Sequence, residues 1–194
     1  MPIRLIKTKR FVDERGWFSE TYNRHTYGLL GIEAAFCQDN HSLSRMPGVL
    51  RGLHFQRPPH AQAKLIRCIR GRVWDVAVDI RSGSPTYGKW AGLELDAKSG
   101  LEIFVPVGYA HGFLALEPDS EVEYKVSAYY APECEGGLMW NDPDLAIKWP
   151  LNSDSPSLSP KDAALPYFAD FTSPFAYDGS PMLLPDADLF ESSP

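Results

Sequence analysis

The segment Gly48–Gln56, which reads GVLRGLHFQ, carries the side chains best suited to chemistry. His54 lies in an apolar, strand-like run, where a buried imidazole needs polar partners to offset its lost hydration. An imidazole titrates near neutral pH, which suits acid–base chemistry. A core histidine satisfied by hydrogen bonds is an equally good interpretation of this segment taken alone, so both interpretations stay open.

Arg51 lies three residues before His54, so a regular strand would point the two side chains to opposite faces. Gly52 stands between them and could host a β-bulge, an extra residue that shifts the alternation of the strand. We therefore predict that a bulge at Gly52 brings Arg51 and His54 into one cavity.

A second histidine, His111, stands in residues 106–113, which read PVGYAHGF. This run matches the P-x-G-x-x-H pattern of cupin barrels, where the histidine points inward. Many cupins bind a metal through an earlier H-x-H pair, but the corresponding place here reads His54-Phe55-Gln56, and an amide is a weak ligand for first-row metals. The remaining histidines have no useful spacing to this pair; they are His25, His41 and His60. The sequence therefore predicts no metal site.

The elements that must position these side chains have the pattern of strands. Apolar residues alternate along residues 73–80, 101–105 and 122–130, and turns rich in Gly, Pro and Ser separate these runs. Many short strands with little helical periodicity predict an all-β fold, a double-sheet jelly-roll barrel with a few short helices. The interior of such a barrel is lined by every second residue.

The length of 194 residues suits one well-packed domain, and no internal repeat is visible. After Lys161 the chain has no lysine or arginine, and its last part is rich in proline and acidic residues. We expect a single domain over residues 1–170, followed by an acidic, proline-rich tail over residues 171–194. Phe171 and Phe175 could lay part of this tail on the barrel.

The composition excludes several classes of protein. With 44% hydrophobic and 23% charged residues, the chain is not globally disordered. The net charge of -6 argues against a general nucleic-acid binder, although a few arginines can still hold a phosphate. Three cysteines (Cys37, Cys68 and Cys134) without metal spacing fit reduced thiols. Because no signal sequence or membrane-spanning stretch is visible, we expect a cytoplasmic protein with no membrane or nucleic-acid partner.

An ordered series of motifs resembles the dTDP-4-dehydrorhamnose 3,5-epimerase family. The series covers most of the chain, and it is the order of the motifs that makes the resemblance specific. The motifs are FVDERGWFSE (11–20), QDNHS (38–42), RGLHFQ (51–56), KL (64–65), DVAVDIR (75–81), PVGYAHGF (106–113), YK (124–125), WNDP (140–143) and LSPKD (158–162). The resemblance implies a cupin-type jelly roll, a homodimer whose N-terminal strands pack against the partner, and no cofactor.

The resemblance also implies the catalytic groups for removing a proton next to a ketone. Such chemistry needs a base, an acid on the opposite face of the sugar and a positive donor at the developing enolate oxygen. His54 corresponds to the base, and Asp162 to the carboxylate that fixes its tautomer. Lys64 corresponds to the cation near the keto oxygen, and Tyr124 to the acid.

The remaining family positions imply the ligands of a dTDP-linked 4-keto sugar. Arg15 and Arg51 suit the diphosphate, because guanidinium pairs with phosphate oxygens through two hydrogen bonds. The alternation of residues does not decide which of Tyr129 and Tyr130 faces the site. The implied substrate-binding residues are Arg15, Glu20, Gln38, Asp39, Asn40, Arg51, His111, Tyr129, Glu135 and Lys161.

The function implied by the resemblance is epimerisation of dTDP-4-dehydro-6-deoxy-D-glucose at C3 and C5, giving dTDP-4-dehydro-L-rhamnose in dTDP-L-rhamnose biosynthesis. Three alternatives stay open: a mono-epimerase of another dTDP-4-keto-deoxysugar, a metal-dependent cupin, and a noncatalytic nucleotide-sugar binder. Without the resemblance, Tyr124 would be an ordinary barrel-wall tyrosine and Lys64 a solvated edge lysine. Asp162 would be a turn residue and Arg15 a partner in a surface ion pair.

Overall fold

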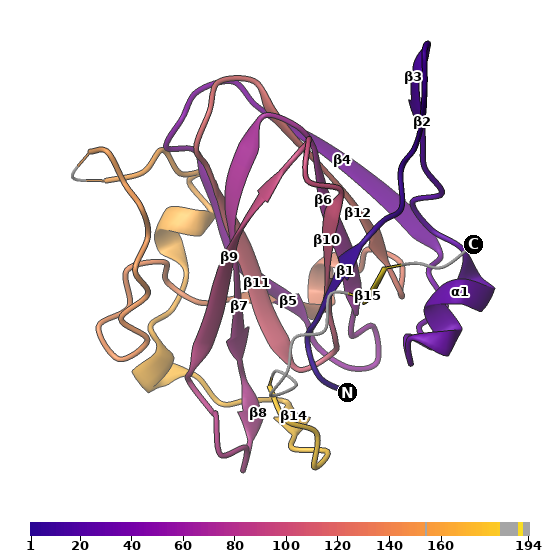
Figure 1. Ribbon diagram of the computed structural model, residues 1–194. Coiled ribbons are helices and arrows are strands. Elements are labelled where there is room, and N and C mark those ends of the chain that lie inside the picture. Colours follow the sequence, from indigo (N-terminus) through magenta and orange to yellow (C-terminus); the bar gives the residue numbers. More distant parts are fainter. Residues whose placement is uncertain (154, 183–189, 192–194) are drawn as a thin grey trace.

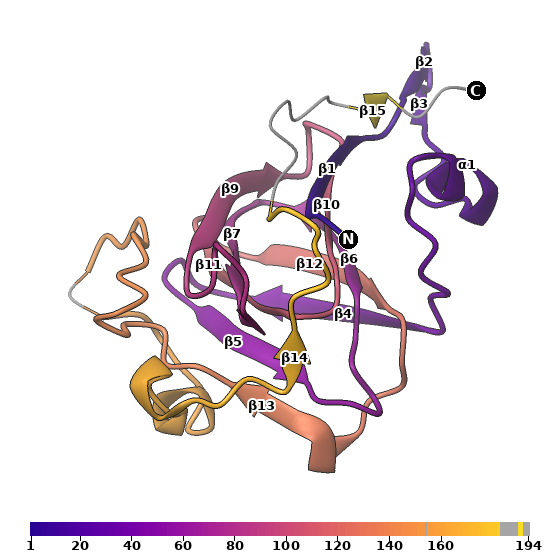
Figure 2. The same cartoon turned by 90° about the horizontal axis from the view of Figure 1, so that it is seen from below.

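The computed structural model describes residues 1–153, 155–182 and 190–191. Two mainly antiparallel sheets face each other and form a barrel (Figures 1 and 2), so the predicted all-β jelly roll is confirmed. The first sheet has the order β15 (Phe190–Glu191), β1 (Arg4–Lys7), β10 (Leu101–Val105), β6 (Lys64–Arg70), β12 (Ser120–Val126) and β4 (Gln38–Ser44). The second has the order β13 (Glu135–Gly137), β5 (Leu50–Gln56), β11 (Tyr109–Ala115), β7 (Arg72–Asp79) and β9 (Trp90–Asp96).

Smaller elements surround the barrel. Figure 1 shows the hairpin of β2 (Phe11–Asp13) and β3 (Gly16–Phe18) extending away from it. Strand β14 (Phe175–Ala176) pairs in parallel with β8 (Arg81–Ser82). The helices are the six-residue α1 (Arg24–Leu29) and three 3₁₀ turns, η1 (Pro132–Cys134), η2 (Asp162–Ala164) and η3 (Phe168–Asp170). None of the helices in the described ranges has the length and apolar character needed to cross a membrane.

Strand β7 shows why the barrel core is continuous. It lies between β11 and β9, and the alternating valines at 76 and 78 are fully buried. The other face, which carries Asp75 and Asp79, is fully buried as well. A buried carboxylate needs partners, and the structure supplies them: Asp75 bonds to His111, and Asp79 bonds to Arg81.

Strand β12 ends earlier than the sequence pattern suggests. The alternation continues to Tyr130, but pairing with β4 and β6 stops at Val126. Ser127 then binds the chain just before β6, because its hydroxyl accepts a hydrogen bond from the Ala63 N–H and its own N–H donates to the Ala63 carbonyl. The expectation of a strand up to Tyr130 is therefore wrong, and residues 127–131 form an irregular connection.

Part of the predicted tail packs on the barrel, as its aromatic residues suggested. Phe175 and Met182 are buried, and Phe171 packs against the same apolar cluster as Phe175. In the view from below, the segment containing β14 runs across the near end of the barrel (Figure 2). Residues 183–189 and 192–194 of the predicted tail lie outside the described residues. A domain boundary at residue 170 stays a prediction.

Candidate active site

Two adjoining cavities lie between the sheets, each with a volume of about 240 Å³. Three of the four predicted catalytic residues, His54, Lys64 and Tyr124, line both cavities. Polar side chains make up most of the remaining walls. The first cavity also includes Gln38, Asn40, Gln62, Tyr130 and Glu135, and the second Ser42, Arg51, His111, Ser159, Lys161 and Asp162.

The predicted bulge at Gly52 is confirmed. Across the β5–β11 ladder His54 lies opposite His111 and Arg51 lies opposite Phe113, so two residues of β5 face only Gly112. This shift places Arg51 and His54 on the same wall of the second cavity. Gly52 has φ of +130°, and a Cβ atom there would lie 2.5 Å from the Gly112 Cα. Only glycine fits this position.

His54 is held by Asp162 at the edge of the second cavity. Its Nε2 lies 2.6 Å from the Asp162 Oδ1, and Asp162, the first residue of η2, is buried. Burial alone would raise the pKa of Asp162, but hydrogen bonds from His54, Ser159 and the Gly52 N–H outweigh it, and the pKa is lowered. The carboxylate is therefore ionised at neutral pH and orients the imidazole. Since Nε2 faces Asp162, Nδ1 is the nitrogen left to accept a proton.

Lys64 places a positive charge between the two cavities. Its ammonium group is buried and donates to the His54 carbonyl at 3.2 Å. Burial lowers the pKa of Lys64 to about 8, and the nearby charges of Asp75 and Glu135 oppose this shift. The ammonium form therefore dominates at neutral pH, but the pKa lies only about one unit above that pH.

Tyr124 faces His54 from the opposite sheet. Tyr124 lies on β12 in the first sheet and His54 on β5 in the second, and both border both cavities. Burial raises the pKa of Tyr124, although the positive charge of Arg51 opposes the shift. The phenol is therefore protonated at neutral pH. A ligand between the sheets would have a base on one side and a proton donor on the other.

A second histidine–aspartate pair lies beside the first, and sequence reasoning missed its carboxylate. His111 Nε2 lies 2.8 Å from the Asp75 Oδ2, and both side chains are buried. The other oxygen of Asp75, Oδ1, has no hydrogen-bond partner among the described residues. The signal was present in the sequence: a carboxylate in the apolar run of residues 73–80 must find a partner if both faces of the strand are buried.

The predicted strand of Gln38 and Asn40 lines the first cavity. The two side chains are joined by a hydrogen bond of 2.8 Å, and the Gln38 Oε1 accepts from the Tyr130 N–H. Asp39, between them, points to the other face and forms an exposed ion pair with Lys125. The structure therefore brings Gln38 and Asn40 into the site but not Asp39.

Glu135 and Lys161 form an ion pair at the mouth of the site. The Tyr130 hydroxyl also donates to Glu135, at 3.0 Å. Tyr130 borders the first cavity, whereas Tyr129, the tyrosine predicted to bind substrate, is exposed and lines neither cavity. The alternation of residues could not decide between Tyr129 and Tyr130, because β12 ends at Val126, before either tyrosine.

Arg15 and Glu20 do not reach the cavity of their own chain. Arg15 lies in the turn of the exposed β2–β3 hairpin and pairs with Asp13, with 3.1 Å between Nε and Oδ2. Glu20 follows the hairpin and accepts a hydrogen bond from Asn23. Figure 1 shows this hairpin standing away from the barrel. If these two side chains bind a ligand, it is not the one in their own cavity.

Gln56, the residue that replaces the second histidine of a metal cupin, has a structural role. Its amide nitrogen donates to the backbone carbonyls of His60 and Tyr129, and its oxygen accepts from the Ala131 N–H. The amide therefore ties three pieces of chain together. Within residues 1–153, 155–182 and 190–191, no three His, Cys, Asp or Glu side chains gather in a group that could hold a metal ion.

The chain is similar to known proteins over most of its length. A family model described as dTDP-4-dehydrorhamnose 3,5-epimerase matches residues 2–170. The protein of that description from Salmonella typhimurium is 50% identical over 163 residues, which cover 84% of this chain and 88% of the relative.

Solved structures of sugar epimerases have the same fold. The dTDP-6-deoxy-D-glucose-3,5-epimerase of Legionella pneumophila, in complex with dTDP-4-keto-L-rhamnose, superposes with a TM-score of 0.83 at 44% identity, covering 88% of this chain and 89% of that one. ChmJ, a 3'-monoepimerase from Streptomyces bikiniensis in complex with dTDP-quinovose, gives a TM-score of 0.80 at 34% identity, covering 86% and 84%. These likenesses confirm the cupin-type jelly roll.

Proposed function

This chain belongs to the dTDP-4-dehydrorhamnose 3,5-epimerase family, and from that premise we propose that it inverts C3 and C5 of dTDP-4-dehydro-6-deoxy-D-glucose. The product is dTDP-4-dehydro-L-rhamnose, the intermediate expected in dTDP-L-rhamnose biosynthesis. One observation carries the proposal: His54 with Asp162 and Tyr124 approach one space from opposite sheets, with the Lys64 ammonium beside them. This is the arrangement needed to remove a proton from one face of a sugar and return one to the other.

The reaction begins with the base. The ketone at C4 acidifies the C–H bonds at C3 and C5, and the free Nδ1 of His54 takes one of these protons. Asp162 stabilises the imidazolium that forms, because its carboxylate accepts from Nε2 at 2.6 Å. Base catalysis of this kind contributes roughly 10²–10⁴-fold.

The negative charge that leaves the C–H bond moves onto the C4 oxygen as an enolate. Lys64 is the cation that can stabilise this oxygen, since its ammonium is buried next to His54 and away from bulk water. The Tyr124 phenol then donates its proton to the opposite face of the same carbon, which inverts the centre. The imidazolium and the phenolate return to their starting forms by proton exchange, and the cycle repeats at the second carbon.

Substrate placement follows from the two cavities. The sugar lies among His54, Lys64 and Tyr124, and Arg51 on the second cavity wall faces the charge of the diphosphate. Gln38 and Asn40 supply hydrogen bonds to the nucleoside from the first cavity. Glu135 and Lys161, which pair with each other, line the two cavities and are further substrate ligands in this proposal.

The homodimer belongs to the same proposal. Arg15 and Glu20 are expected ligands, yet they lie on or just after a hairpin outside their own barrel. The hairpin carries exposed apolar residues, among them Val12, Trp17 and Phe18, which suit burial against a second copy. A dimer in which each hairpin reaches the partner's cavity accounts for both facts. A cytoplasmic location fits the free thiols of all three cysteines.

Solvent deuterium tests the proposal. Purified protein is incubated in D₂O with dTDP-4-dehydro-6-deoxy-D-glucose, and the label at C3 and C5 is followed by NMR. Label at both carbons is the expected result. Label at one carbon alone would favour the mono-epimerase, an alternative supported by the likeness to ChmJ. No label at either carbon would reject the proposed function.

A further inference from the structure

Residues 171–182, which we name the C-terminal strap, begin just after the part of the chain that matches the family model. The strap is attached at several points along its length. Strand β14 pairs with β8, the Tyr177 N–H donates to the Ser82 carbonyl, and the Met182 carbonyl accepts from the Ile3 N–H. Figure 2 shows it crossing the end of the barrel. These contacts make the strap an ordered part of the fold.

The strap packs directly behind the proposed catalytic base. Phe55, the residue after His54 on β5, is buried, and its ring centroid lies 5.5 Å from that of Phe171 and 5.9 Å from that of Phe175. On another side, a Cβ atom at Gly136 would lie 2.5 Å from the Phe55 ring. Phe55 therefore packs between Gly136 and the two strap rings, and these rings support β5 next to His54.

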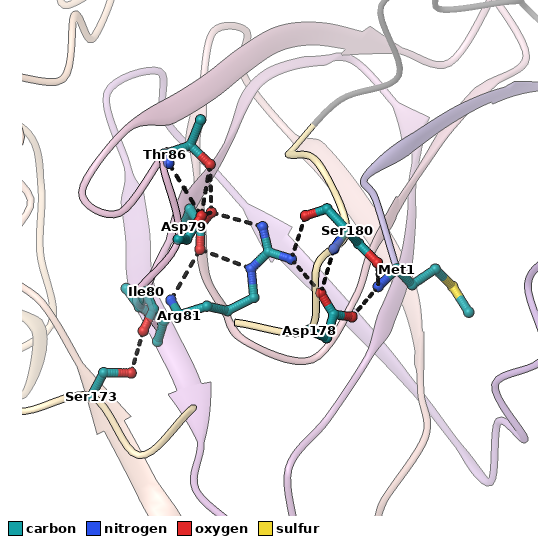
Figure 3. Close-up of polar contacts among 9 residues, drawn as sticks. Met1, Asp79, Ile80, Arg81, Thr86, Ser173, Asp178 and Ser180 are labelled. Atoms are coloured by element: carbon teal, nitrogen blue, oxygen red, sulfur yellow. Dashed lines mark hydrogen bonds and ion pairs between the residues drawn. The ribbon is translucent and has the colours of Figure 1, made fainter. Parts of the chain in front are cut away.

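The strap also reaches β11, the strand of His111, through Arg81. Figure 3 shows the Arg81 guanidinium joining Asp79 to Asp178 of the strap, with 2.7 Å between Nη2 and the Asp79 Oδ2 and 3.0 Å between Nη1 and the Asp178 Oδ1. The guanidinium carbon lies 4.6 Å from the ring of Tyr109, the first residue of β11. It lies 5.1 Å from the ring of Tyr177 in the strap.

We propose that the C-terminal strap is a positioning element for the two imidazoles of the site, the catalytic His54 and the wall residue His111. It fixes β5 through Phe175 and β11 through Arg81, and these two strands carry His54 and His111 opposite each other. Phe175 and Asp178 are then positioning residues, which touch no substrate but set where the imidazoles stand. The inference rests on the proposed function. Its physical basis is that a misplacement of about 1 Å near the reacting atoms can cost on the order of 100-fold in rate.

The test compares strap variants with a control that removes a buried residue elsewhere. Phe175→Ala removes the ring behind Phe55, and Phe175→Leu restores much of its volume. Ile32→Ala removes a buried side chain from a separate apolar cluster that contains no strap residue. For each variant, kcat and KM for deuterium exchange are measured well below the thermal midpoint, together with the affinity for dTDP.

The expected result is a fall of about tenfold in kcat for Phe175→Ala, with KM and dTDP affinity within about twofold of wild type. Phe175→Leu should recover most of the lost kcat, and Ile32→Ala should lower the thermal midpoint while leaving kcat unchanged. A Phe175→Ala protein that is folded and has wild-type kcat would overturn the inference, as would an equal loss of kcat in Ile32→Ala.

A second variant decides the matter if Phe175→Ala does not fold. Asp178→Asn weakens the link to Arg81 but leaves no cavity, since the Asp178 side chain is half exposed. We expect kcat to fall at least twofold at unchanged KM, and an unchanged kcat would contradict the inference. Failure of the proposed function is distinguishable, because wild-type protein would then show no exchange at all.

Discussion

The two histidine–aspartate pairs have the same bond and different surroundings. In both, a carboxylate oxygen lies within 2.8 Å of Nε2, and the two imidazoles are opposite each other on neighbouring strands. His54 keeps 28% of its side chain exposed and lines both cavities, whereas His111 is 6% exposed and lines only the second. The exposed pair is therefore suited to exchange protons with a ligand, and the buried pair to hold one wall of the site.

The carboxylates differ in the same way. Asp162 stands on a short 3₁₀ turn outside the sheets and receives hydrogen bonds from Ser159 and Gly52 as well as from His54. Asp75 stands inside a central strand, fully buried, with one oxygen unpartnered among the described residues. Besides its bond to His111, the Asp75 charge raises the pKa of Lys64.

Among the residues that support the base His54, the largest expected effect comes from Lys64, the cation influenced by the buried pair. Lys64→Met should lower kcat by roughly 10²–10³-fold, the usual loss when a donor to a developing oxyanion is removed. In wild type, kcat should fall as pH rises through about 8, because the ammonium loses its proton there. A steady-state pH profile measures both effects, and a profile that is flat up to pH 10 would contradict this role.

The same lysine links stability to pH. The folded pKa of about 8 lies below the ordinary value of 10.5, so the unfolded chain binds more protons between these two pH values. The free energy of unfolding should therefore rise with pH in this window, and the rise should be absent in Lys64→Met.

Asp75→Asn should move the alkaline fall in kcat to lower pH, since Asp75 raises the pKa of Lys64. Asp162→Asn should leave that fall in place.

Asp162→Asn should give the next largest effect, a fall of about 100-fold in kcat. An amide that donates to Nε2 would select the wrong tautomer and put the proton on Nδ1, the nitrogen that acts as base.

Because the pKa of Asp162 is lowered in the fold, its contribution to stability is present above the unfolded value of 3.8 and is lost as pH falls below it. Chemical unfolding between pH 3 and 7 checks this, and wild type should lose its advantage over the variant at the acid end.

Replacing the two histidines should give opposite rankings in activity and stability. His111→Asn should lower kcat by about tenfold, far less than His54→Asn, for which base removal implies roughly 10²–10⁴-fold. In stability the order should reverse, because His111→Asn leaves the buried Asp75 charge without its partner, a loss on the order of 3 kcal/mol. Exchange kinetics measure the order of the two variants in kcat, and urea unfolding measures their order in the free energy of unfolding. If one variant were worse in both measurements, the division of roles between the pairs would be wrong.

The smallest effect is expected at Ser159, whose hydroxyl supports Asp162. Ser159→Ala removes the acceptor for the Asp162 N–H and one hydrogen bond to its carboxylate. We expect a fall of about threefold in kcat, equivalent to the loss of a hydrogen bond of roughly 0.5–1.5 kcal/mol. Ser159→Thr keeps the hydroxyl and serves as the control. A threonine variant as impaired as the alanine variant would show that side-chain size, and not the hydrogen bond, matters here.

The sequence predicts the fold well, because alternating apolar residues and turn residues are local signals. It also predicts the bulge. In a regular strand Arg51 and His54 would point to opposite faces, and one extra residue at Gly52 is enough to bring both to the same face. The positions of Tyr129 and Tyr130 could not be predicted, because the hydrogen bonds between Ser127 and Ala63 that end β12 join distant parts of the chain.

The parts of the site that the sequence did not predict also depend on contacts between distant parts of the chain. The Asp75–His111 bond joins residues 36 positions apart in the chain, and no local pattern shows that both faces of β7 are buried. For Arg15, local sequence gives the hairpin and its ion pair with Asp13. The binding role proposed for Arg15 requires the proposed second copy of the chain, and local sequence patterns do not place that copy.

In the proposed mechanism His54, and not His111, takes the substrate proton. The most direct test is deuterium exchange into dTDP-4-dehydro-6-deoxy-D-glucose by His54→Asn and His111→Asn side by side, with dTDP affinity confirming that both sites are intact. We expect no label from His54→Asn over a period in which His111→Asn labels both C3 and C5. Label at a near wild-type rate from His54→Asn would contradict it.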